Sequence, residues 1–380
     1  MIVLKDKKDC CGCHACLSVC AHKAITMSAD TEGFLYPTVD KEACAECGLC
    51  EQVCPVIHQA TPTRPIKVYA ARSKDEAIRQ ESSSGGIFTL LAGAVIREGG
   101  VVFGAKFDEG WNVVHAAAEN TDEMALFRGS KYVQSTIGDT YKEAKKHLKQ
   151  GRKVLFSGTP CQIAGLKRYL RKDYDNLLAV DVVCHGVPSP LVWQRYLEGM
   201  STKGAIKDIA FRDKTRGWAQ YAFRFRTENQ TLLLPPSENP FMRGFLTDLY
   251  LRPSCHACPA RCGKSGSDIT LGDFWGVKAV HPEMDDNKGC SAIMIHTTKG
   301  QALYDSIEKV DVESRYEHLL PENPSLEHSP KHTKYARRFW KRFDKQGLDC
   351  VFPICKQKAS SSLLLQYLKI KRALLGLLKR

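Results

Sequence analysis

The chain has 380 residues, a formal net charge of +13 and 17 cysteines. This length predicts two or three domains with a buried core, and the apolar content of 43% excludes a disordered or fibrous chain. Met1–Lys8 has no secretory signal, and no uninterrupted apolar run is long enough to span a bilayer. So many cysteines then indicate a reducing compartment, and we expect a cytoplasmic protein, whether free or peripheral to the inner membrane face.

The charge is unevenly distributed along the chain. Residues 1–60 contain five Lys and Arg against eight Asp and Glu, a net charge of −3, so the remainder carries +16. A basic body attracts an acidic electron-transfer partner, a phosphorylated cofactor or an anionic membrane surface. No nucleic-acid-binding motif accompanies the charge, so we expect no nucleic-acid partner.

Two matched cysteine runs open the chain, each with the spacing C-x-x-C-x-x-C-x-x-x-C, and the second run ends in Pro55. In bacterial two-cluster ferredoxins this spacing holds two 4Fe–4S clusters, and the fourth cysteine of each run ligates the other run's cluster. A disulfide scaffold would need a secretory signal, and zinc would use the cysteines in pairs. The ligand sets are therefore Cys10, Cys13, Cys16 and Cys54 for one cluster, and Cys20, Cys44, Cys47 and Cys50 for the other. We expect Cys11, the extra thiol of the first run, to be a bystander.

After the proline-containing linker, small residues at Ser82–Gly86 precede a predicted helix that begins at Ile87. Free amides at such a helix start suit a phosphate, but an ordinary serine cap with a glycine turn explains the same pattern. Residues 101–107 and 112–119 then predict paired strands joined by a turn.

Two strand–turn–helix units, at residues 153–170 and 177–197, predict an α/β sheet with a ligand site at the carboxyl ends of its strands. Antiparallel strands are expected within residues 206–234, followed by a second cysteine group within residues 252–276. The basic, leucine-rich tail from residue 360 predicts an amphipathic helix that packs on its own domain, on a partner or on a membrane surface.

Five motifs occur in a recognisable order: SSSGGIF, FRGSKYVQS, FSGTPCQIAGLK, VCHGVPSP and SDITLGDFWG. In these motifs the chain resembles the family of beta subunits of coenzyme F420 hydrogenases and dehydrogenases, in the fusion with an N-terminal ferredoxin domain. The resemblance implies an iron–sulfur flavoprotein that binds FAD, holds a third 4Fe–4S cluster beside it, and exchanges electrons with a deazaflavin or another acceptor. Many fused bacterial members of this family look like accessory proteins of cell-surface polysaccharide synthesis.

The resemblance also implies roles for individual residues. Flavin contacts fall on Ser83, Ser84, Gly85, Gly86, Gly129, Ser130, Lys131 and Tyr132. Ligands of the third cluster fall on Cys161, Cys184, Cys255 and Cys258. Cys262, which family members often lack, competes with Cys161 for this role. Asp273 either orients the flavin or a ligand or is structural, and no catalytic residue is assigned, His185 included.

The predicted fold class is α+β or α/β, with a ferredoxin-like two-cluster domain followed by an α/β flavin-binding body. The predicted divisions are a two-cluster domain at 1–58, a linker at 59–66, the two parts of the body at 67–150 and 151–335, and a basic helical tail at 336–380.

The predicted function is an iron–sulfur flavoprotein oxidoreductase that passes electrons between ferredoxin-type clusters and a FAD-bound hydride site, in the service of cell-surface polysaccharide synthesis. The expected redox partner is ferredoxin, a deazaflavin or a nicotinamide carrier. The alternative is a non-catalytic electron-transfer adaptor that docks, through its tail, in a larger or membrane-associated assembly.

Overall fold

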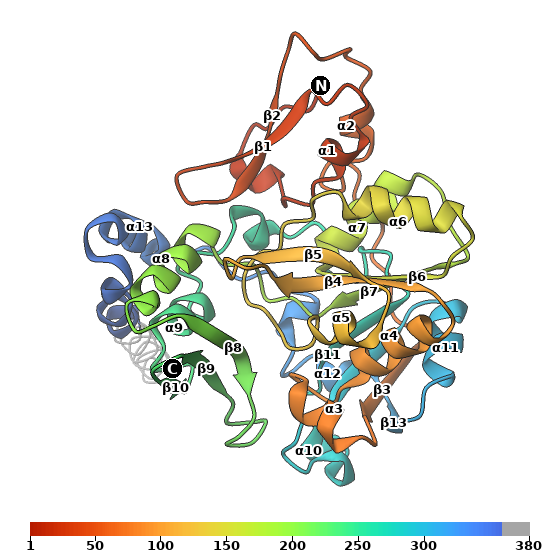
Figure 1. Ribbon diagram of the computed structural model, residues 1–380, viewed down its shortest axis with the longest axis vertical. Helices are drawn as coiled ribbons and strands as arrows, with labels where there is room; N and C mark the ends of the chain where they lie inside the picture. Colours follow the sequence, from red (N-terminus) through yellow and green to blue (C-terminus); the bar gives the residue numbers. More distant parts are fainter. Residues whose placement is uncertain (359–380) are drawn as a thin grey trace, which may run out of the picture.

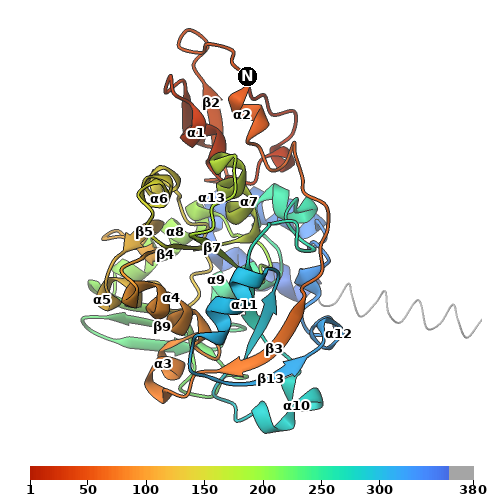
Figure 2. The ribbon, with the colours of Figure 1, turned by 90° about the vertical axis from the view of Figure 1, so that its right-hand side faces the viewer.

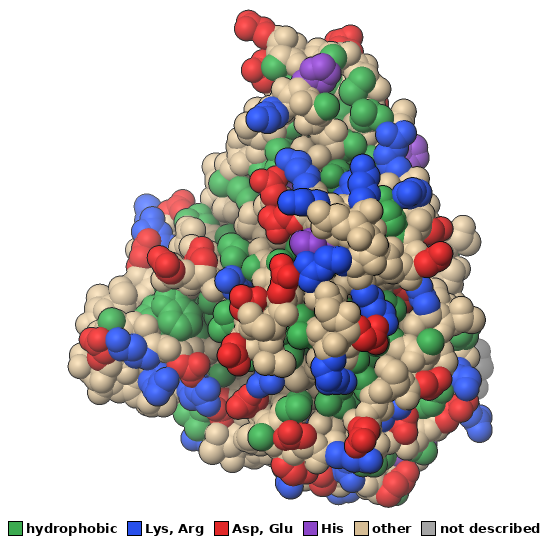
Figure 3. Space-filling model, turned by 45° about the vertical axis from the view of Figure 1, so that its right-hand side comes forward, with side chains coloured by type: hydrophobic (Ala, Val, Ile, Leu, Met, Phe, Trp, Pro, Cys, Tyr) green, Lys and Arg blue, Asp and Glu red, His purple; other side chains and the backbone are tan. Residues whose placement is uncertain are grey.

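The computed structural model describes residues 1–358, so residues 359–380 of the predicted tail lie outside the described residues. A small N-terminal domain stands at one end of a larger body, above helices α6 (Thr140–Lys149) and α7 (Pro160–Leu170) (Figure 1, Figure 2). On the face shown in Figure 3, acidic side chains lie at the tip of this domain, and lysine and arginine side chains gather near its base. The uneven charge of the sequence is therefore also uneven in space.

The N-terminal domain repeats one small unit. Each cysteine run forms a loop and a short helix, α1 (Ala15–Val19) or α2 (Leu49–Gln52), and between the runs β1 (Ile25–Ala29) pairs antiparallel with β2 (Leu35–Val39). The shared core of this domain consists of Ile2, Ile25 and three cysteines, with a few half-buried apolar neighbours. So small an apolar core leaves the bound metal to supply much of the folding free energy.

The body is built on one eight-stranded sheet with the order β13-β3-β12-β11-β7-β6-β4-β5. Its four middle strands, from β11 to β4, run parallel, and the remaining pairings are antiparallel, so the sheet is mixed. The strands are β3 (Lys67–Arg72), β4 (Val101–Phe107), β5 (Val113–Ala118), β6 (Val154–Gly158), β7 (Leu177–Val182), β11 (Ile269–Asp273), β12 (Ser291–Ile295) and β13 (Val310–Ser314).

Helices cover both faces of this sheet. One face packs against α4 (Ile87–Arg97), α5 (Thr121–Ala125) and α11 (Thr298–Asp305), and the other packs against α6 and α7. Cys11, Cys13, Ala15 and Val53 extend this second apolar cluster into the N-terminal domain, so the two units share a core.

A second core lies beside the sheet. There β8 (Ile206–Asp213), β9 (Ala222–Thr227) and β10 (Thr231–Leu234) form an antiparallel sheet that packs against α8 (Pro190–Ser201), α9 (Pro240–Leu246) and α13 (Lys334–Gln346). The described part of the predicted tail is therefore a packed element, because Phe339 and Phe343 of α13 are buried in this core.

The remaining short helices are η1 (Lys7–Asp9), α3 (Glu76–Glu81), η2 (Pro253–Ala257), α10 (Val277–Val280), η3 (Pro282–Met284), α12 (Tyr316–Leu319), η4 (Pro324–Leu326) and η5 (Gly347–Cys350). Within residues 1–358 every helix is too short or too polar to traverse a lipid bilayer. The paired strands 101–107 and 112–119, and both strand–turn–helix units, agree with the sequence prediction.

Candidate functional site

The two cysteine runs line two cavities in the N-terminal domain. The first ferredoxin cavity is lined by Cys10, Cys13, Cys16 and Cys54, with Cys11 also in its wall. The second ferredoxin cavity is lined by Cys20, Cys44, Cys47 and Cys50. The fold therefore places the fourth cysteine of each run with the first three of the other, as the spacing predicts.

The surroundings of these cysteines fit iron–sulfur clusters. His14 (φ 62°) and Gly48 (φ 72°) follow the second cysteine of their runs, and both take the left-handed conformation that turns the loop into its helix. Burial raises the pKa of the Cys16 thiol to about 12. A thiol of this kind becomes a thiolate at neutral pH only when a metal cation takes the place of its proton.

A third group of cysteines lies in the body. The body cysteine cavity is lined by Cys11, Cys161, Cys184, Cys255, Cys258 and Cys262. Cys161 stands in the first turn of α7, Cys184 follows β7, and Cys255 and Cys258 belong to the η2 segment. The strand ends and the η2 segment thus meet here, as the resemblance implies.

Cys262 differs from the other body cysteines in its contacts. Its Sγ atom lies 3.7 Å from the carbonyl oxygen of Glu327, and its backbone donates to Leu326. The Sγ atoms of Cys255 and Cys161 instead accept from the Val187 amide at 3.4 Å and contact the Thr159 hydroxyl at 3.3 Å. These two contacts are of the kind that supports a thiolate, so the geometry favours Cys161 over Cys262 as a ligand.

Cys11 has more contacts than the bystander expected from the sequence. Its buried thiol hydrogen-bonds with both Cys13 and Cys161, and the residue lines the first ferredoxin cavity as well as the body cysteine cavity. Spacing could not reveal this contact, because Cys11 and Cys161 meet only when the N-terminal domain packs on α7.

A cavity of about 310 Å³ at the carboxyl ends of the parallel strands is the candidate site for an organic cofactor. This volume lies within the range of small-molecule sites, about 300–1,000 Å³. Of the predicted flavin contacts, its lining contains Ser83, Ser84, Gly86, Gly129, Ser130, Lys131 and Tyr132. We call it the serine–glycine cavity.

Gly85 does not line the serine–glycine cavity, contrary to the role implied for it. Its amide donates to the Ser291 hydroxyl at 2.9 Å, and a Cβ atom at this position would lie 2.4 Å from the carbonyl oxygen of Ala71. Gly85 is therefore a glycine because the loop passes directly against β3.

The start of α4 is suited to an anionic group. Gly86 adopts φ 86° and directs the chain into the helix, and the Thr89 hydroxyl in the first turn lines the cavity. That hydroxyl is buried and has no hydrogen-bond partner among the described residues. A buried orphan hydroxyl beside free helix amides is a site where a phosphate or other acceptor gains hydrogen bonds.

Lys131, in the wall of the serine–glycine cavity, carries an amino group whose charge depends on pH. Its Nζ atom donates to the carbonyl oxygens of Arg128, at 2.9 Å, and Gly129, at 3.2 Å, and no carboxylate of the described chain pairs with it. Burial lowers the pKa of Lys131 to about 7. An anion in the cavity would favour the charged form of this lysine.

The floor of the cavity contains polar residues that the sequence did not single out. The His115 Nε2 atom lies 2.9 Å from the Ser157 carbonyl oxygen, and its Nδ1 atom lies 2.9 Å from the Ser135 hydroxyl. A carbonyl can only accept, so Nε2 carries the proton and Nδ1 accepts from Ser135. Burial lowers the pKa of His115 to about 4 and keeps it neutral. The sequence did not indicate this role of His115, because a single histidine within a predicted strand belongs to no recognisable motif.

Asp273 acts through its neighbours. Its carboxylate accepts from Arg212, with Nη1 to Oδ2 at 2.8 Å, and from the Trp218 indole nitrogen at 2.9 Å. Arg212 in turn donates to the Tyr132 hydroxyl at 3.3 Å. Asp273 lies in the cavity wall, where it anchors the arginine that reaches Tyr132. His185, in the same wall, hydrogen-bonds Asp248 at 2.7 Å.

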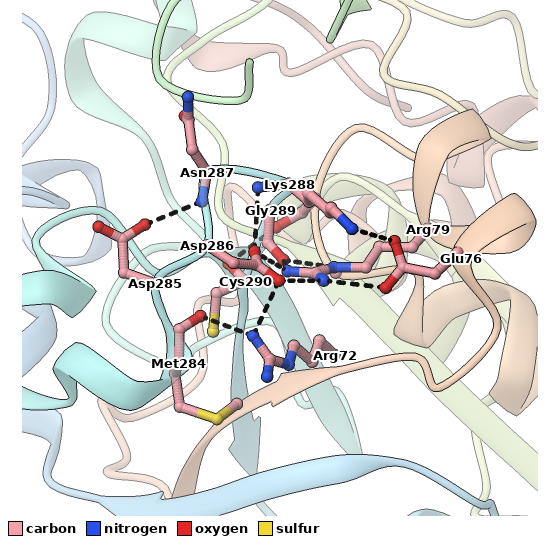
Figure 4. A network of polar contacts seen from close by, with 12 residues as sticks. Arg72, Glu76, Arg79, Met284, Asp285, Asp286, Asn287, Lys288, Gly289 and Cys290 are labelled. Carbon is pink, nitrogen blue, oxygen red and sulfur yellow. Dashed lines mark hydrogen bonds and ion pairs between the residues drawn. The ribbon is translucent and has the colours of Figure 1, made fainter.

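A polar network around Arg79 and Asp286 (Figure 4) lies next to the serine–glycine loop, residues 82–86, and supports it. Arg79, only 1% exposed, donates through Nη1 to Asp286 Oδ2 at 2.6 Å and through Nε to the Gly289 carbonyl oxygen at 3.0 Å. The buried ammonium group of Lys214 donates to the carbonyl oxygens of Ser84, at 3.0 Å, and Lys288, at 2.8 Å. The loop before α4 is thus bound to a segment some 200 residues later in the chain.

Comparison with protein families agrees with this architecture. Residues 68–140 match the N-terminal model of the coenzyme F420 hydrogenase/dehydrogenase beta subunit, and residues 151–315 match its C-terminal model. The chain belongs to the family of coenzyme F420 hydrogenase/dehydrogenase beta subunits. Residues 9–57 match a 4Fe–4S dicluster domain. The family resemblance and the two ferredoxin-type clusters expected from the sequence are confirmed.

Individual relatives within this family are distant. A coenzyme F420-dependent sulfite reductase of Methanocaldococcus jannaschii is 26% identical over 205 residues, which are 51% of this chain and 30% of that protein. A subunit of the F420H2 dehydrogenase of Methanosarcina mazei is 23% identical over 189 residues, which are 46% of this chain and 53% of that protein. The matches thus span about half or less of the length of these relatives.

Among solved structures, a chain of the F420-reducing NiFe hydrogenase complex from Methanosarcina barkeri aligns with 75% of this chain. The alignment covers 90% of that chain, at 19% identity and a TM-score of 0.45.

The substitution Asp286→Asn tests the network beneath the loop. It removes the charge that pairs with the buried Arg79, so we expect the free energy of unfolding to fall by about 1–3 kcal/mol. Glu76→Gln is the matched control. The Glu76 side chain is 61% exposed, and exposed ion pairs contribute about 0–1 kcal/mol. Denaturant unfolding followed by circular dichroism measures both, and equal effects would contradict the role of Asp286.

Proposed function

We propose that the chain is an iron–sulfur flavoprotein that conducts electrons between its ferredoxin-type clusters and FAD bound in the serine–glycine cavity, by way of a third 4Fe–4S cluster. The main support for this order of electron transfer is that neighbouring cavities share lining residues. Cys11 lines both the first ferredoxin cavity and the body cysteine cavity, and Cys184 lines both the body cysteine cavity and the serine–glycine cavity.

The residues of the serine–glycine cavity suit FAD. The amides at the start of α4 and the Thr89 hydroxyl would hold the phosphates, and Lys131 would face a phosphate or the negatively charged part of the reduced ring. Bound flavin supplies the means of exchanging electrons in pairs with a carrier, whereas each cluster carries one. His115 stays neutral and accepts from Ser135, which keeps the floor of the cavity fixed and uncharged.

The third cluster would be held by Cys161, Cys184, Cys255 and Cys258. Burial raises the pKa of the Cys184 thiol well above its usual range and that of Cys255 to about 12, as it does for Cys16 in the dicluster domain. Among the described residues, no group of three or more His, Cys, Asp or Glu is placed to hold a single metal ion. A cubane needs four cysteine ligands that each bind a separate iron, and the body cysteine cavity offers them.

The carrier that exchanges electrons with this flavin is proposed to be a deazaflavin, because both named relatives act with coenzyme F420 or its reduced form. An anaerobic screen of reduced deazaflavin, reduced ferredoxin and nicotinamide donors, followed by the flavin absorbance, decides among the carriers. A protein that holds its iron but shows no bleaching with any donor would be an adaptor. The link to cell-surface polysaccharide synthesis rests on the resemblance alone, and no contact described above adds to it.

The substitution Cys161→Ser tests the third cluster, with Cys262→Ser as its matched control in the same cavity. After anaerobic reconstitution, C161S is expected to lose about a third of the iron of the wild type, which holds three cubanes under the proposal. C262S is expected to keep its iron, because its thiol contacts Glu327 rather than the other cysteines. Iron analysis and low-temperature electron paramagnetic resonance (EPR) measure both. Loss of iron in C262S but not in C161S would reverse the ligand assignment.

The affinity for FAD is expected to depend on pH through Lys131. This lysine is charged below a pH of about 7 and neutral above it, so affinity falls as the pH rises, and the bound anion displaces the fall to somewhat higher pH. Lys131→Met should weaken binding about tenfold at pH 6, equivalent to one ion pair of about 1.4 kcal/mol, and should flatten the pH profile. Titration of the apoprotein with FAD measures this effect.

Lys142→Met is the control for Lys131, because Lys142 is an exposed lysine of α6 that pairs with Asp139. Its FAD affinity and pH profile should match those of the wild type. A pH profile in K131M that still falls as in the wild type would exclude Lys131 as the titrating group.

A further inference from the structure

Arg252 connects the body to the N-terminal domain. It directly precedes η2, is 1% exposed, and donates to the carbonyl oxygens of Cys10 (from Nε) and Leu35 (from Nη2), each at 2.8 Å. Nη1 donates to the Gln134 side chain at 3.0 Å. All three nitrogens of the guanidinium group are therefore used, and two of them hold the backbone of the N-terminal domain.

The charge of Arg252 has no carboxylate partner. Among the described residues no Asp or Glu forms an ion pair with it, and its guanidinium lies 4.5 Å from the ring centre of Tyr36 and 5.4 Å from that of Phe34. A fully buried cation without a counter-charge is costly to the fold. The group placed to supply negative charge is the first cysteine set, since Nη2 lies 3.5 Å from Cys10 Sγ.

The first cysteine loop is shaped around this arginine. Gly12 lies between Cys10 and Cys13 with φ 68°, and a Cβ atom there would come within 2.8 Å of Arg252 Nη1. A side chain at position 12 would therefore collide with the guanidinium group as well as strain the backbone. This close contact between Gly12 and Nη1 does not depend on the hydrogen bonds of Arg252. It is a second observation that places the charge of Arg252 beside the first cysteine loop.

The two cysteine sets of the N-terminal domain differ in this respect. Among the described residues no lysine or arginine contacts a sulfur atom of the second set, where Cys50 Sγ accepts from the Ile2 backbone amide at 3.2 Å. The potentials of 4Fe–4S clusters depend on net charge, on hydrogen bonds to their sulfurs and on exposure. Between the two clusters of the N-terminal domain, a fixed cation beside the sulfur of the first set stabilises the reduced, more negative state of the first cluster and not that of the second.

We propose that Arg252 is a positioning residue that raises the reduction potential of the cluster held by Cys10, Cys13, Cys16 and Cys54. This inference rests on the proposed function. The raised potential makes this cluster the electron acceptor of the pair. It also lies on the side of the body, where Cys255 N donates to the Arg252 carbonyl oxygen at 2.9 Å. Electrons that reach the second cluster from a partner are thereby drawn toward the body.

The test is an EPR-monitored redox titration of the full chain, reconstituted anaerobically. In Arg252→Gln, one cluster transition should move to lower potential by at least a tenfold change in the ratio of reduced to oxidised cluster, about 59 mV for a one-electron couple. The transition of the second cluster, held by Cys20, Cys44, Cys47 and Cys50, should stay in place. Arg252→Lys keeps a charge and should shift by less than half as much. Arg64→Gln is the control, because Arg64 joins the linker to Glu327 and contacts no cysteine.

The outcomes separate the inference from the function beneath it. A wild-type protein without clusters or flavin overturns the proposed function, and the inference with it. An iron-replete R252Q with unchanged transitions, or equal shifts in R252K and R252Q, overturns the inference alone. If R252Q does not retain iron, Gln134→Leu takes its place, because it removes the acceptor that orients Nη1, together with the Nε2 donor to the Cys11 carbonyl oxygen. A smaller shift in the same direction then supports the role of Arg252, and unchanged transitions overturn it.

Discussion

A thiol surrounded by apolar side chains does not ionise unaided, and this constraint governs the whole molecule. Burial favours the neutral thiol at Cys16 of the first ferredoxin cavity and at Cys255 of the body cysteine cavity. Metal binding reverses that preference, because a cation stabilises several thiolates at once. Since the apolar core of the N-terminal domain is small, the metal supplies much of the free energy that holds this domain together. Folding and redox chemistry therefore depend on the same sulfur atoms.

The body adds a second constraint, set by the sheet. The parallel strands β4, β6, β7 and β11 end at one edge, and the loops that follow them carry the cavity walls. Ligand sites in α/β sheets lie at such carboxyl ends. The loop after β7 bears Cys184 and His185 next to one another, so one short segment contributes to the wall of two cavities. The proposed third cluster and the proposed flavin would therefore lie close together without any further structural element.

Local sequence patterns predicted much of this arrangement. Cysteine spacing predicted the exchange of fourth ligands, and helical and strand periodicity located the two strand–turn–helix units. The motifs located most residues of the serine–glycine cavity. What escaped prediction depends on contacts between distant segments. Arg79 meets Asp286, Gly85 meets Ser291 and Arg252 meets Cys10, each across more than 200 residues, and a single sequence does not encode such pairings in any local pattern. Buried arginines and lysines are also rare, so their charge would ordinarily be expected at the surface.

The place of Cys11 has a consequence for how the protein is made. Because this residue belongs to the wall of the body cysteine cavity, the N-terminal domain completes part of that wall when it packs on α7. The third cluster proposed for the body would be inserted before this part of the wall is in place. In that order of assembly, the cluster of the body cysteine cavity would be inserted first. Docking of the N-terminal domain on α7 would then cover it.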